Sequence, residues 1–320
     1  MDYKERLDYS SLSCYIDCPR KFYFKYILHL RTRAKNINLV FGSAWHYGLE
    51  VAYRAKQADP TLGPEALRDI ATKGFNALWA LEGTSFDPDI VFPKSPGHAA
   101  NMYNKYWQVD PVPSDAEILA IESPFEVSLS HLRPGLPAYI GRLDLVLLMP
   151  DGSLRIIDHK TTKSINTVTH TSFECSLQTD GYLTVGHLYY DKVPSMVYSI
   201  ALCQKSKIDF HQMVINKPRM TIDRFLADLS FYAQEIVDNI HLLHEERASE
   251  ADRSYNLRAF PRRPGYACTS YFRPCSYYDI CKLRANPALW TDKPPSGYEQ
   301  HEWDPATHEA ELAARLKEAS

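Results

Sequence analysis

The chain has 320 residues and carries 36 lysines and arginines against 39 aspartates and glutamates, a formal net charge of −3. Its composition, 45% hydrophobic and 23% charged, is typical of a globular protein and excludes a disordered or fibrous one. The net charge alone argues against a nucleic-acid partner, although a sum hides how charges are arranged. No apolar run approaches the roughly 20 residues of a spanning helix. Because MDYKERLDYS has no signal-peptide core, we expect a soluble, cytoplasmic protein.

The hydrophobic spacing changes from helical to strand-like near residue 117 and back again later. This order predicts an α/β or α+β core with a helical N-terminal elaboration. The predicted helices are 11–30, 40–56, 64–81, 98–108, 173–190, 219–244 and 305–318, and the predicted strands are 117–129, 138–150, 153–161, 195–203 and 210–216. A Pro-rich linker follows residue 284.

One predicted hairpin gathers acidic residues. Asp151-Gly152 favours a two-residue turn, and counting outward places Asp144 opposite His159, within one residue of Asp158. Asp158 and Lys160 point to one face because strand side chains alternate. Two carboxylates at that spacing repel each other unless a cation lies between them, and such oxygen ligands suit Mg²⁺ or Mn²⁺. The lysine can then orient or deprotonate an attacking water and offset charge on a phosphate. A surface hairpin with ordinary ion pairs is the alternative.

Other polar residues near this hairpin are ambiguous by themselves. His46 in FGSAWHYGLE lies on an apolar helix face, where a histidine is more often a packed core residue than a ligand. Gln178 and Tyr182 are four residues apart and therefore share a helix face. Glu122 and Glu126 are either charges at a strand edge or groups that support the site from behind.

Three cysteines fall within fourteen residues, in CTSYFRPCSYYDIC. Without an export signal, dense cysteines indicate metal or cluster ligation rather than disulfides. Structural zinc sites usually contain CxxC pairs, and this run has none. A cubane iron–sulfur cluster needs a fourth thiolate in addition to these three. Cys18 is the first candidate for it and Cys14 the second, while Cys175 and Cys203 are expected simply to be packed. The alternative is that the thiols are small buried hydrophobes.

Four ordered motifs resemble the PD-(D/E)xK nuclease superfamily, specifically its RecB-like branch with an iron–sulfur cluster. They are SSLSCYIDCPRKFYF, FGSAWH, GRLDLV…IIDHK followed by QTDGY, and the closing cysteine run, and they extend from about residue 8 to residue 284. The resemblance implies a restriction-endonuclease-like core, a central mixed β-sheet flanked by helices, with a C-terminal iron–sulfur segment. It implies one nuclease domain over 1–284, divided into a helical elaboration (about 10–110), a core (about 115–245) and a cluster-binding segment (253–284, with Cys18), before a linker and helix over 285–320.

Carried over position by position, the resemblance implies a role for each motif residue. The metal would be bound by His46, Asp144, Asp158 and the backbone carbonyl of His159, and Lys160 would be the catalytic lysine. The QxxxY motif beside the active site and DNA would be formed by Gln178 and Tyr182. A 4Fe–4S cluster would be held by Cys18, Cys268, Cys275 and Cys281. Two positions depart from the family pattern. Asp158 stands where many members have Glu, and Phe272 stands where many have a cysteine, which leaves Cys268 or Cys14 to supply that ligand.

The function implied is a Mg²⁺- or Mn²⁺-dependent deoxyribonuclease that uses metal-activated water. An exonuclease is favoured because no separate recognition module is evident. The chain resembles stand-alone phage recombination exonucleases and CRISPR-adaptation nucleases. The sequence contains no phosphate-binding loop, which a fusion with a helicase would have. It implies DNA recombination, repair or processing, with DNA ends as substrate and a recombination or single-strand-annealing protein as a partner. A catalytically silent DNA-binding scaffold is the alternative, and a redox iron–sulfur protein is disfavoured because no flavin or nicotinamide motif is present.

The charge is unevenly distributed along the chain. Residues 19–35 and 253–284 together sum to +12, which leaves −15 for the remaining 271 residues. Both stretches flank the proposed cluster cysteines and are interleaved with aromatic residues, namely Phe22, Tyr23, Tyr266 and Tyr271. We therefore expect a basic groove that follows the DNA backbone and stacks bases, with the cluster as a staple and platform.

Overall fold

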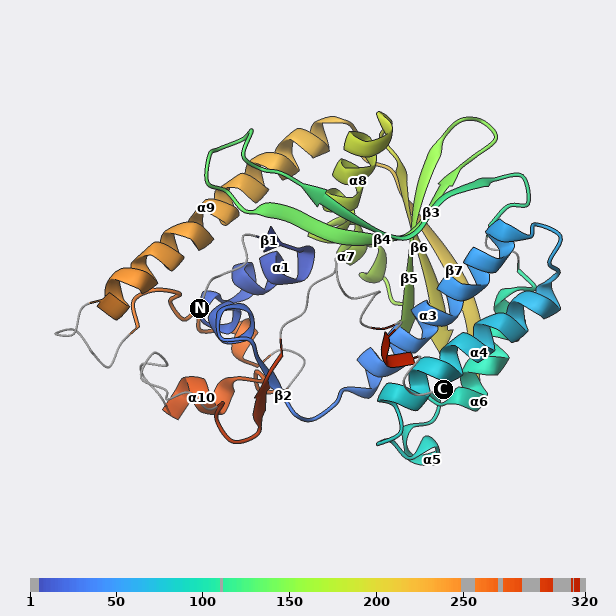
Figure 1. Cartoon of the computed structure of the whole chain (residues 1–320), viewed down its shortest axis with the longest axis horizontal. Coiled ribbons are helices and arrows are strands. Elements are labelled where there is room, and N and C mark those ends of the chain that lie inside the picture. Colours follow the sequence, from blue (N-terminus) through green and yellow to red (C-terminus); the bar gives the residue numbers. More distant parts are fainter. Residues whose placement is uncertain are drawn as a thin grey trace. The chain divides into compact units, whose positions relative to one another are not determined.

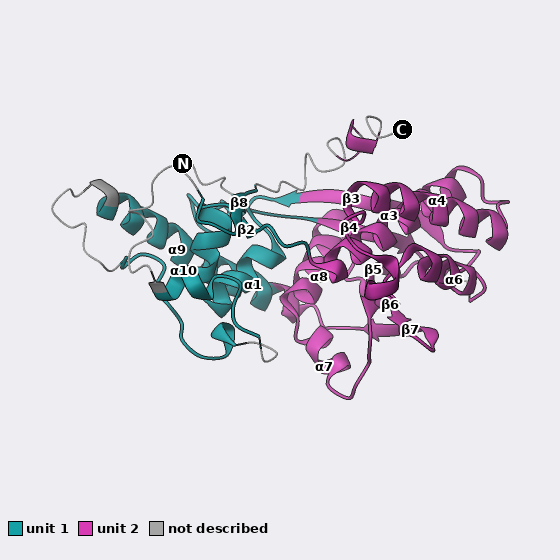
Figure 2. Cartoon of the chain, turned by 90° about the horizontal axis from the view of Figure 1, so that it is seen from below, with its two compact units in different colours: residues 1–35, 126–141, 223–304 teal, residues 36–125, 142–222, 305–320 magenta. Residues whose placement is uncertain are grey.

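The computed structural model describes residues 6–109, 112–248, 257–269, 273–283, 294–301, 312 and 314–316. The chain divides into two compact units (Figure 2). Unit 1 comprises residues 1–35, 126–141 and 223–304, and unit 2 comprises residues 36–125, 142–222 and 305–320. Every predicted metal-binding and catalytic residue belongs to unit 2, whereas the four predicted cluster cysteines belong to unit 1.

A mixed β-sheet positions the candidate site (Figure 1). Its strand order is β1-β4-β5-β6-β7, with β3 paired to β4. Strands β5 and β6 are parallel, and the pairs β4–β5 and β6–β7 are antiparallel. The strands are β1 (Arg6–Leu7), β3 (Glu117–Val127), β4 (Ala138–Leu148), β5 (Leu154–Thr162), β6 (Ser195–Cys203) and β7 (Ile208–Ile215). The predicted mixed central sheet is confirmed.

The turn between β4 and β5 differs from the prediction. The N–H of Met149 donates to the carbonyl of Ser153 (2.9 Å), so the loop contains three residues, 150–152, rather than two. Gly152 closes the loop with φ +78°, the left-handed conformation that three-residue hairpin loops need at this position. The Asp-Gly signal correctly predicted a hairpin but not the length of its loop.

The longer loop shifts the strand register by one residue. Leu145 pairs with Ile157, so Asp144 follows opposite Asp158 and not opposite His159. The two acidic residues therefore face each other more directly than the two-residue turn would have placed them.

Helices flank both faces of the sheet in unit 2. Trp45 of α3 stacks on Tyr103 of α6 (ring centroids 4.2 Å apart), and both belong to a buried cluster that includes Ile157 of β5. Ile156 points the other way, where its Cδ1 approaches Gly186 of α8. The helices of this unit are α3 (Ile37–Ala58), α4 (Pro64–Glu82), α5 (Pro88–Val91), α6 (Pro96–Tyr106), α7 (Thr169–Glu174) and α8 (Leu177–Tyr190).

The predicted helix over 173–190 is interrupted at its start. Helix α7 ends before Cys175, and the side chain of Ser176 then accepts the N–H of Gln178 to cap α8. A serine at this position satisfies a backbone donor that the first helical turn leaves unpaired. The cap fixes the first residue of α8 and therefore the positions of Gln178 and Tyr182 on this helix.

The predicted helix over 11–30 is also wrong as a single element. In unit 1 the chain forms α1 (Tyr9–Asp17), α2 (Pro19–Phe22), a π-helix η1 (Tyr23–Ile27) and strand β2 (Leu30–Thr32). The break occurs at Cys18, which is extended (φ −164°, ψ 109°) because the following Pro19 disfavours helical backbone before it. Cys18 therefore stands at a helix boundary.

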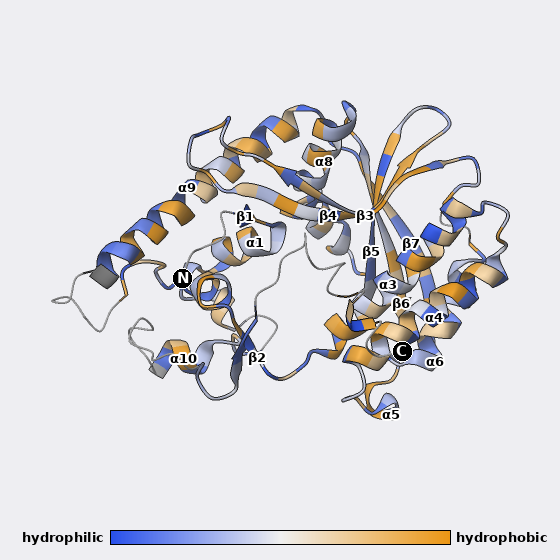
Figure 3. Cartoon of the chain, viewed as in Figure 1, coloured by the Kyte–Doolittle hydropathy of each residue, from blue (hydrophilic) through white to orange (hydrophobic). Residues whose placement is uncertain are grey.

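The remaining elements of unit 1 come from the C-terminal part of the chain. Strand β8 (Tyr298–Gln300) pairs with β2 in antiparallel fashion. Helix α9 (Met220–Ala248) alternates hydrophobic and hydrophilic segments (Figure 3), and η3 (Tyr266–Cys268) and α10 (Tyr278–Leu283) follow it. Of the predicted helix 305–318, residues 312 and 314–316 are helical and the others lie outside the described residues. Within the described ranges, no helix is long and apolar enough to cross a membrane.

Candidate active site

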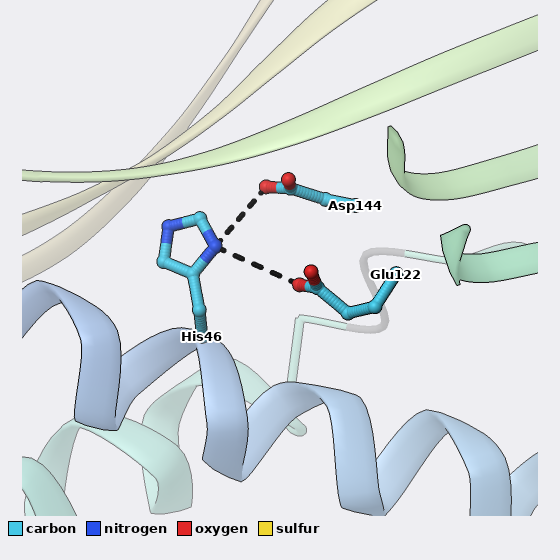
Figure 4. A group of neighbouring side chains, drawn as sticks. All are labelled: His46, Glu122 and Asp144. Carbon is cyan, nitrogen blue, oxygen red and sulfur yellow. Dashed lines mark ion pairs between the residues drawn. The ribbon is translucent and has the colours of Figure 1, made fainter. Parts of the chain in front are cut away.

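Three side chains from three elements of unit 2 converge (Figure 4). Nδ1 of His46 in α3 lies 3.2 Å from Asp144 Oδ2 in β4 and 3.8 Å from Glu122 Oε1 in β3. One potential ligand atom from each residue lies within 4.8 Å of the others. Both carboxylates are buried, while the side chain of His46 is 29% exposed. One imidazole and two carboxylates form a donor set that fits a divalent cation such as Mg²⁺ or Mn²⁺.

A second polar group adjoins the first. Asp158 is buried, its Oδ2 lies 2.6 Å from Lys160 Nζ, and its Oδ1 accepts a hydrogen bond from Gln178 Nε2 (2.9 Å). Gln178 Nε2 is also 3.2 Å from Tyr182 Oη, and the Tyr182 hydroxyl donates to the carbonyl of Arg142 (2.8 Å). The Gln178 amide of helix α8 thus positions the Asp158 carboxylate of β5. The Tyr182 hydroxyl of the same helix in turn positions that amide.

The backbone joins the two groups. The N–H of His159 donates to Asp144 Oδ2 (2.9 Å), the same oxygen that faces His46. Because His159 separates Asp158 from Lys160, this bond sets the spacing between the carboxylate of β4 and the two charged residues of β5. The prediction that the carbonyl of His159 binds a metal stays a prediction.

Electrostatics make the first group a partly exposed cation beside two buried anions. Burial would lower the pKa of His46, but Asp144 and Glu122 outweigh it and raise that pKa to about 10. Burial and the charge of Asp144 raise the pKa of Glu122 to about 7, although His46 and the Arg142 guanidinium, 3.1 Å away, oppose this. Burial would raise the pKa of Asp144 as well, but the imidazolium holds it well below its ordinary value. A divalent cation would replace the proton that now balances these charges.

The second group keeps its lysine charged. Burial would lower the pKa of Lys160, but Asp158 and Asp144 hold that pKa above its ordinary value. Burial raises the pKa of Asp158 to about 6 in spite of the adjacent ammonium. Lys160 is therefore a hydrogen-bond donor and a positive charge at neutral pH rather than a proton acceptor.

The side chain of His159 has a packing role. Burial lowers its pKa to about 3, so the ring is neutral. It stacks on Tyr53 of α3 with ring centroids 5.9 Å apart, and neither ring nitrogen has a hydrogen-bond partner among the described residues. The side chain helps to dock α3 on β5, which keeps His46 near the hairpin.

The structure thus brings together all seven residues that the resemblance assigned to the active site, and it adds two. The sequence left Glu122 open between an edge charge and a supporting group, and it did not single out Arg142. Glu122 adopts φ +46°, a left-handed conformation that is uncommon for a non-glycine residue and turns its carboxylate out of the regular strand pattern. A glutamate that follows the apolar run ILAI of this strand was the signal in the sequence.

The four predicted cluster cysteines belong to unit 1. Burial raises the pKa values of Cys275 and Cys281, and Cys18 adds to both shifts, so these thiols are close enough to interact. Cys268 acts on Cys275 in the same way, and its carbonyl accepts the N–H of Cys275 (2.8 Å). Burial raises the pKa of Cys14 to about 12, which disfavours the thiolate that ligation requires. All described cysteines are free thiols.

Part of the expected nucleic-acid surface is buried instead. Phe22 and Tyr23 are fully buried in unit 1 and stack on Phe260, so the expectation that they stack on bases is wrong. Arg20 is also buried and donates to two backbone carbonyls, those of Leu257 and Phe260. Tyr266 is exposed, and Tyr271 lies outside the described residues. Phe22 lies at helical spacing from Tyr15 and Tyr26, a pattern that indicates a core face.

Comparison with known proteins agrees with this geometry. The family model of the PD-(D/E)XK nuclease superfamily matches residues 6–282, and the chain belongs to that superfamily. No curated protein is similar enough in sequence to match the chain. Among solved structures it is similar to a candidate exonuclease from Eubacterium rectale (9% identity, TM-score 0.45, 71% of this chain and 78% of that chain) and to SSO0001 (12%, 0.32, 72% and 78%). At these TM-scores the two similarities support no conclusion about function.

Proposed function

We propose that this protein is a Mg²⁺- or Mn²⁺-dependent deoxyribonuclease that hydrolyses phosphodiester bonds from DNA ends. The observation that carries the proposal is the convergence of His46, Glu122 and Asp144 beside the pair Asp158–Lys160, in a chain that belongs to a nuclease superfamily. Membership of this superfamily supports nuclease chemistry. We propose in addition that the substrate is DNA and that cleavage proceeds from its ends.

The metal would be held by His46, Asp144, Asp158 and the carbonyl of His159, as the resemblance implies. The position of Glu122, within 4.8 Å of the first two, supports it as a further ligand. Such an ion lowers the pKa of a bound water and polarises the phosphate. Before His46 can bind the ion, it must lose the proton that Asp144 and Glu122 stabilise on its ring.

The remaining residues would orient and stabilise. The Lys160 ammonium can donate to the attacking water and offset the negative charge that develops on the phosphate. Gln178 would keep the Asp158 carboxylate in one rotamer through its 2.9 Å hydrogen bond, and Tyr182 would fix the amide of Gln178. Because Gln178 and Tyr182 act only through Asp158, substituting either residue should lower the metal affinity and the cleavage rate together.

A nuclease assay tests this proposal against the scaffold alternative. Linear DNA labelled at one end, with free or blocked ends, is incubated with Mg²⁺ or Mn²⁺. Wild type should release nucleotides from free ends, whereas Lys160→Ala should be at least a hundredfold slower, in the range of 10²–10³ for the loss of one charge-stabilising donor. Lys192→Ala is the matched control, because this exposed lysine donates a hydrogen bond to the carbonyl of Gly152 and is not one of the candidate site residues.

The outcomes of this assay are distinct. Equal degradation by wild type and Lys160→Ala would refute the role of the lysine. No degradation by either, with DNA binding retained, would favour the catalytically silent scaffold. Cleavage of DNA with blocked ends would replace the exonuclease proposal with an endonuclease.

We also propose that Cys18, Cys268, Cys275 and Cys281 hold a 4Fe–4S cluster in unit 1. After burial, Cys18 and Cys268 help to raise the pKa of Cys275, and Cys18 and Cys275 help to raise the pKa of Cys281, which supports the set. The high pKa of Cys14 disfavours it as the fourth ligand. Such a cluster would link the N-terminal α1–α2 break to the C-terminal segment and so restrict the unfolded chain.

Iron analysis of purified protein tests this second proposal. Wild type should be brown and contain about four irons per chain, and Cys275→Ser should lose both colour and thermal stability. Cys175→Ser, at an exposed cysteine of unit 2, should leave both unchanged. Colour and stability unchanged in Cys275→Ser would refute the cluster.

A further inference from the structure

Tyr198 of β6 lies beside the Asp158–Lys160 pair, on the same face of the sheet. Strand β6 runs parallel to β5, and Tyr198 is opposite Asp158 in the register. Residues opposite each other in a sheet share a face, and so do residues two positions apart along a strand, so Tyr198, Asp158 and Lys160 point the same way. The tyrosine is fully buried, and the Lys160 Nζ lies over its ring, 5.9 Å from the ring centroid. An ammonium at this distance is attracted to the negative face of an aromatic ring.

The ring of Tyr198 is held both at its face and at its hydroxyl. Phe173 of α7 stacks on it, with ring centroids 4.0 Å apart and planes inclined by 17°. Thr179 Oγ1 of α8 lies 2.8 Å from the Tyr198 Oη, and it donates to the carbonyl of Phe173 (2.6 Å). Because a hydroxyl has one proton to donate, the Tyr198 hydroxyl must be the donor to Thr179. Helices α7 and α8 therefore fix the orientation of the ring.

Lys160 needs a second contact because its ion pair weakens when a metal ion binds. The Lys160 Nζ lies 2.6 Å from Asp158 Oδ2, and Asp158 is a proposed metal ligand. A divalent cation on this carboxylate would offset its negative charge and repel the ammonium. The Lys160 side chain is 32% exposed, so solvent is open to it as an alternative. The neutral ring of Tyr198 loses no charge to the ion, so its attraction for the ammonium persists.

We propose that Tyr198 is a positioning residue, which keeps the Lys160 ammonium at the active site while a metal ion is bound to Asp158. It acts through Lys160 and does not touch the substrate. Its hydroxyl supports the same arrangement, because Thr179 is next to Gln178, which holds the Asp158 carboxylate. The inference rests on the proposed nuclease function for the role of Lys160, but one of its tests needs no cleavage.

Nuclear magnetic resonance of protein labelled with ¹³C at the lysine ε-carbons tests the contact without cleavage. The ring current of Tyr198 should shift the ε-methylene protons of Lys160 upfield from those of exposed lysines, and the spectrum of Lys160→Arg identifies the signal. Saturating Mg²⁺ should leave this upfield shift in wild type, whereas Tyr198→Leu should remove it. Absence of the shift in wild type, with or without Mg²⁺, would overturn the proposal.

A series of fluorinated rings at position 198 tests the effect on catalysis. The series starts from Tyr198→Phe and continues with mono-, di- and trifluorinated phenylalanine, which weaken the negative potential of the ring face stepwise and change its shape little. Along the series kcat on linear DNA should fall by about tenfold with KM unchanged, because the ammonium stabilises charge that develops in the transition state. A kcat that is constant along the series would overturn the proposal.

Two controls distinguish positioning from packing. The same fluorinated residues at Phe75, a fully buried ring of α4, should leave kcat unchanged. In Lys160→Ala the series at position 198 should have no further effect on the residual rate, because the group through which the ring acts is missing. An equal fall in kcat with and without the Lys160 ammonium would show that Tyr198 acts only by packing, and would overturn the proposal.

These measurements separate the inference from the proposed function. If wild type does not cleave DNA but keeps the upfield Lys160 signal in Mg²⁺, the nuclease is refuted and the contact between Tyr198 and Lys160 stands. If wild type cleaves DNA but kcat is constant along the fluorinated series, the nuclease stands and the role of Tyr198 is refuted.

Discussion

The imidazole of His46 lies between two buried carboxylates, and its protonation decides the charge of the candidate site. Its pKa is raised from 6.5 to about 10, so the folded protein holds a proton that the unfolded chain releases near neutrality. The resulting stabilisation is complete below pH 6.5 and is lost as the pH rises towards 10. A metal ion must displace this proton, so metal binding and protonation compete.

We therefore expect Mn²⁺ affinity to increase with pH. Between pH 7.5 and 8.5 the affinity of wild type should rise by about tenfold per unit, because one proton leaves His46 for each ion bound. Isothermal titration calorimetry measures this. His46→Gln retains an oxygen ligand but has no proton to lose, so its affinity should change little over this range. An equal rise in both proteins would contradict the assignment of the proton to His46.

Arg142 should control the ionisation of Glu122. Its guanidinium opposes the effects of burial and of Asp144, which together raise the pKa of Glu122 to about 7. In Arg142→Gln that pKa should rise further, so Mn²⁺ should bind about tenfold more weakly at pH 7, a typical effect of a group behind the ligands, and recover near pH 9. Arg155→Gln, on the adjacent strand, should show neither effect. A loss that is independent of pH would indicate misfolding instead.

At the scale of elements, the site depends on how closely α3 approaches its neighbours. Gly48 of α3 faces Ala71 of α4 and Tyr103 of α6, and a Cβ there would lie 2.6 Å from the carbonyl of Ala71. Gly42 in the same helix has nothing within 4 Å of its Cβ position. Glycine is thus required at one of these positions by helix packing and not at the other.

The two glycines should respond to alanine in opposite directions. Gly48→Ala should destabilise the protein by about 1–3 kcal/mol, because the added methyl overpacks a closed interface. Gly42→Ala should stabilise it by about 0.5–1 kcal/mol through the higher helix propensity of alanine. Guanidinium unfolding of the two variants and wild type measures both values. Shifts in the same direction would show that the packing of α3 is not what distinguishes them.

At the scale of the whole molecule, the two proposed inorganic sites draw their ligands from different units. The proposed metal ligands lie in unit 2 and the four proposed cluster cysteines in unit 1. The chain passes between the units within β3, β4 and α9, so the active-site hairpin is covalently continuous with both.

Loss of the cluster should therefore leave the metal site intact. Cys275→Ser should bind Mn²⁺ with an affinity within about twofold of wild type, since none of its ligands comes from unit 1. Calorimetry at a temperature below the first unfolding transition is the measurement, with Asp144→Asn as the control that does lose affinity. A large loss in Cys275→Ser would show that unit 1 supports the folding of the metal site.

The local periodicities in the sequence determined which side chains share an element and a face. Alternation paired Asp158 with Lys160, and the four-residue spacing paired Gln178 with Tyr182, because both rules depend only on backbone geometry within one strand or helix. Proline and loop effects modified the boundaries, as at Cys18 and in the three-residue turn at Gly152. Such errors arise because turn length and helix breaks depend on a few dihedral angles that periodicity does not report.

Only the tertiary structure decided which of these elements meet. Glu122 and Arg142 join His46 and Asp144 because β3 pairs with β4 and α3 packs across the sheet, contacts between residues up to about a hundred positions apart. It also decided that Phe22 and Arg20 are buried, and that the Lys160 ammonium lies over the ring of Tyr198. The sequence specified the chemical groups of this protein, whereas burial and long-range packing determined their charges and their partners.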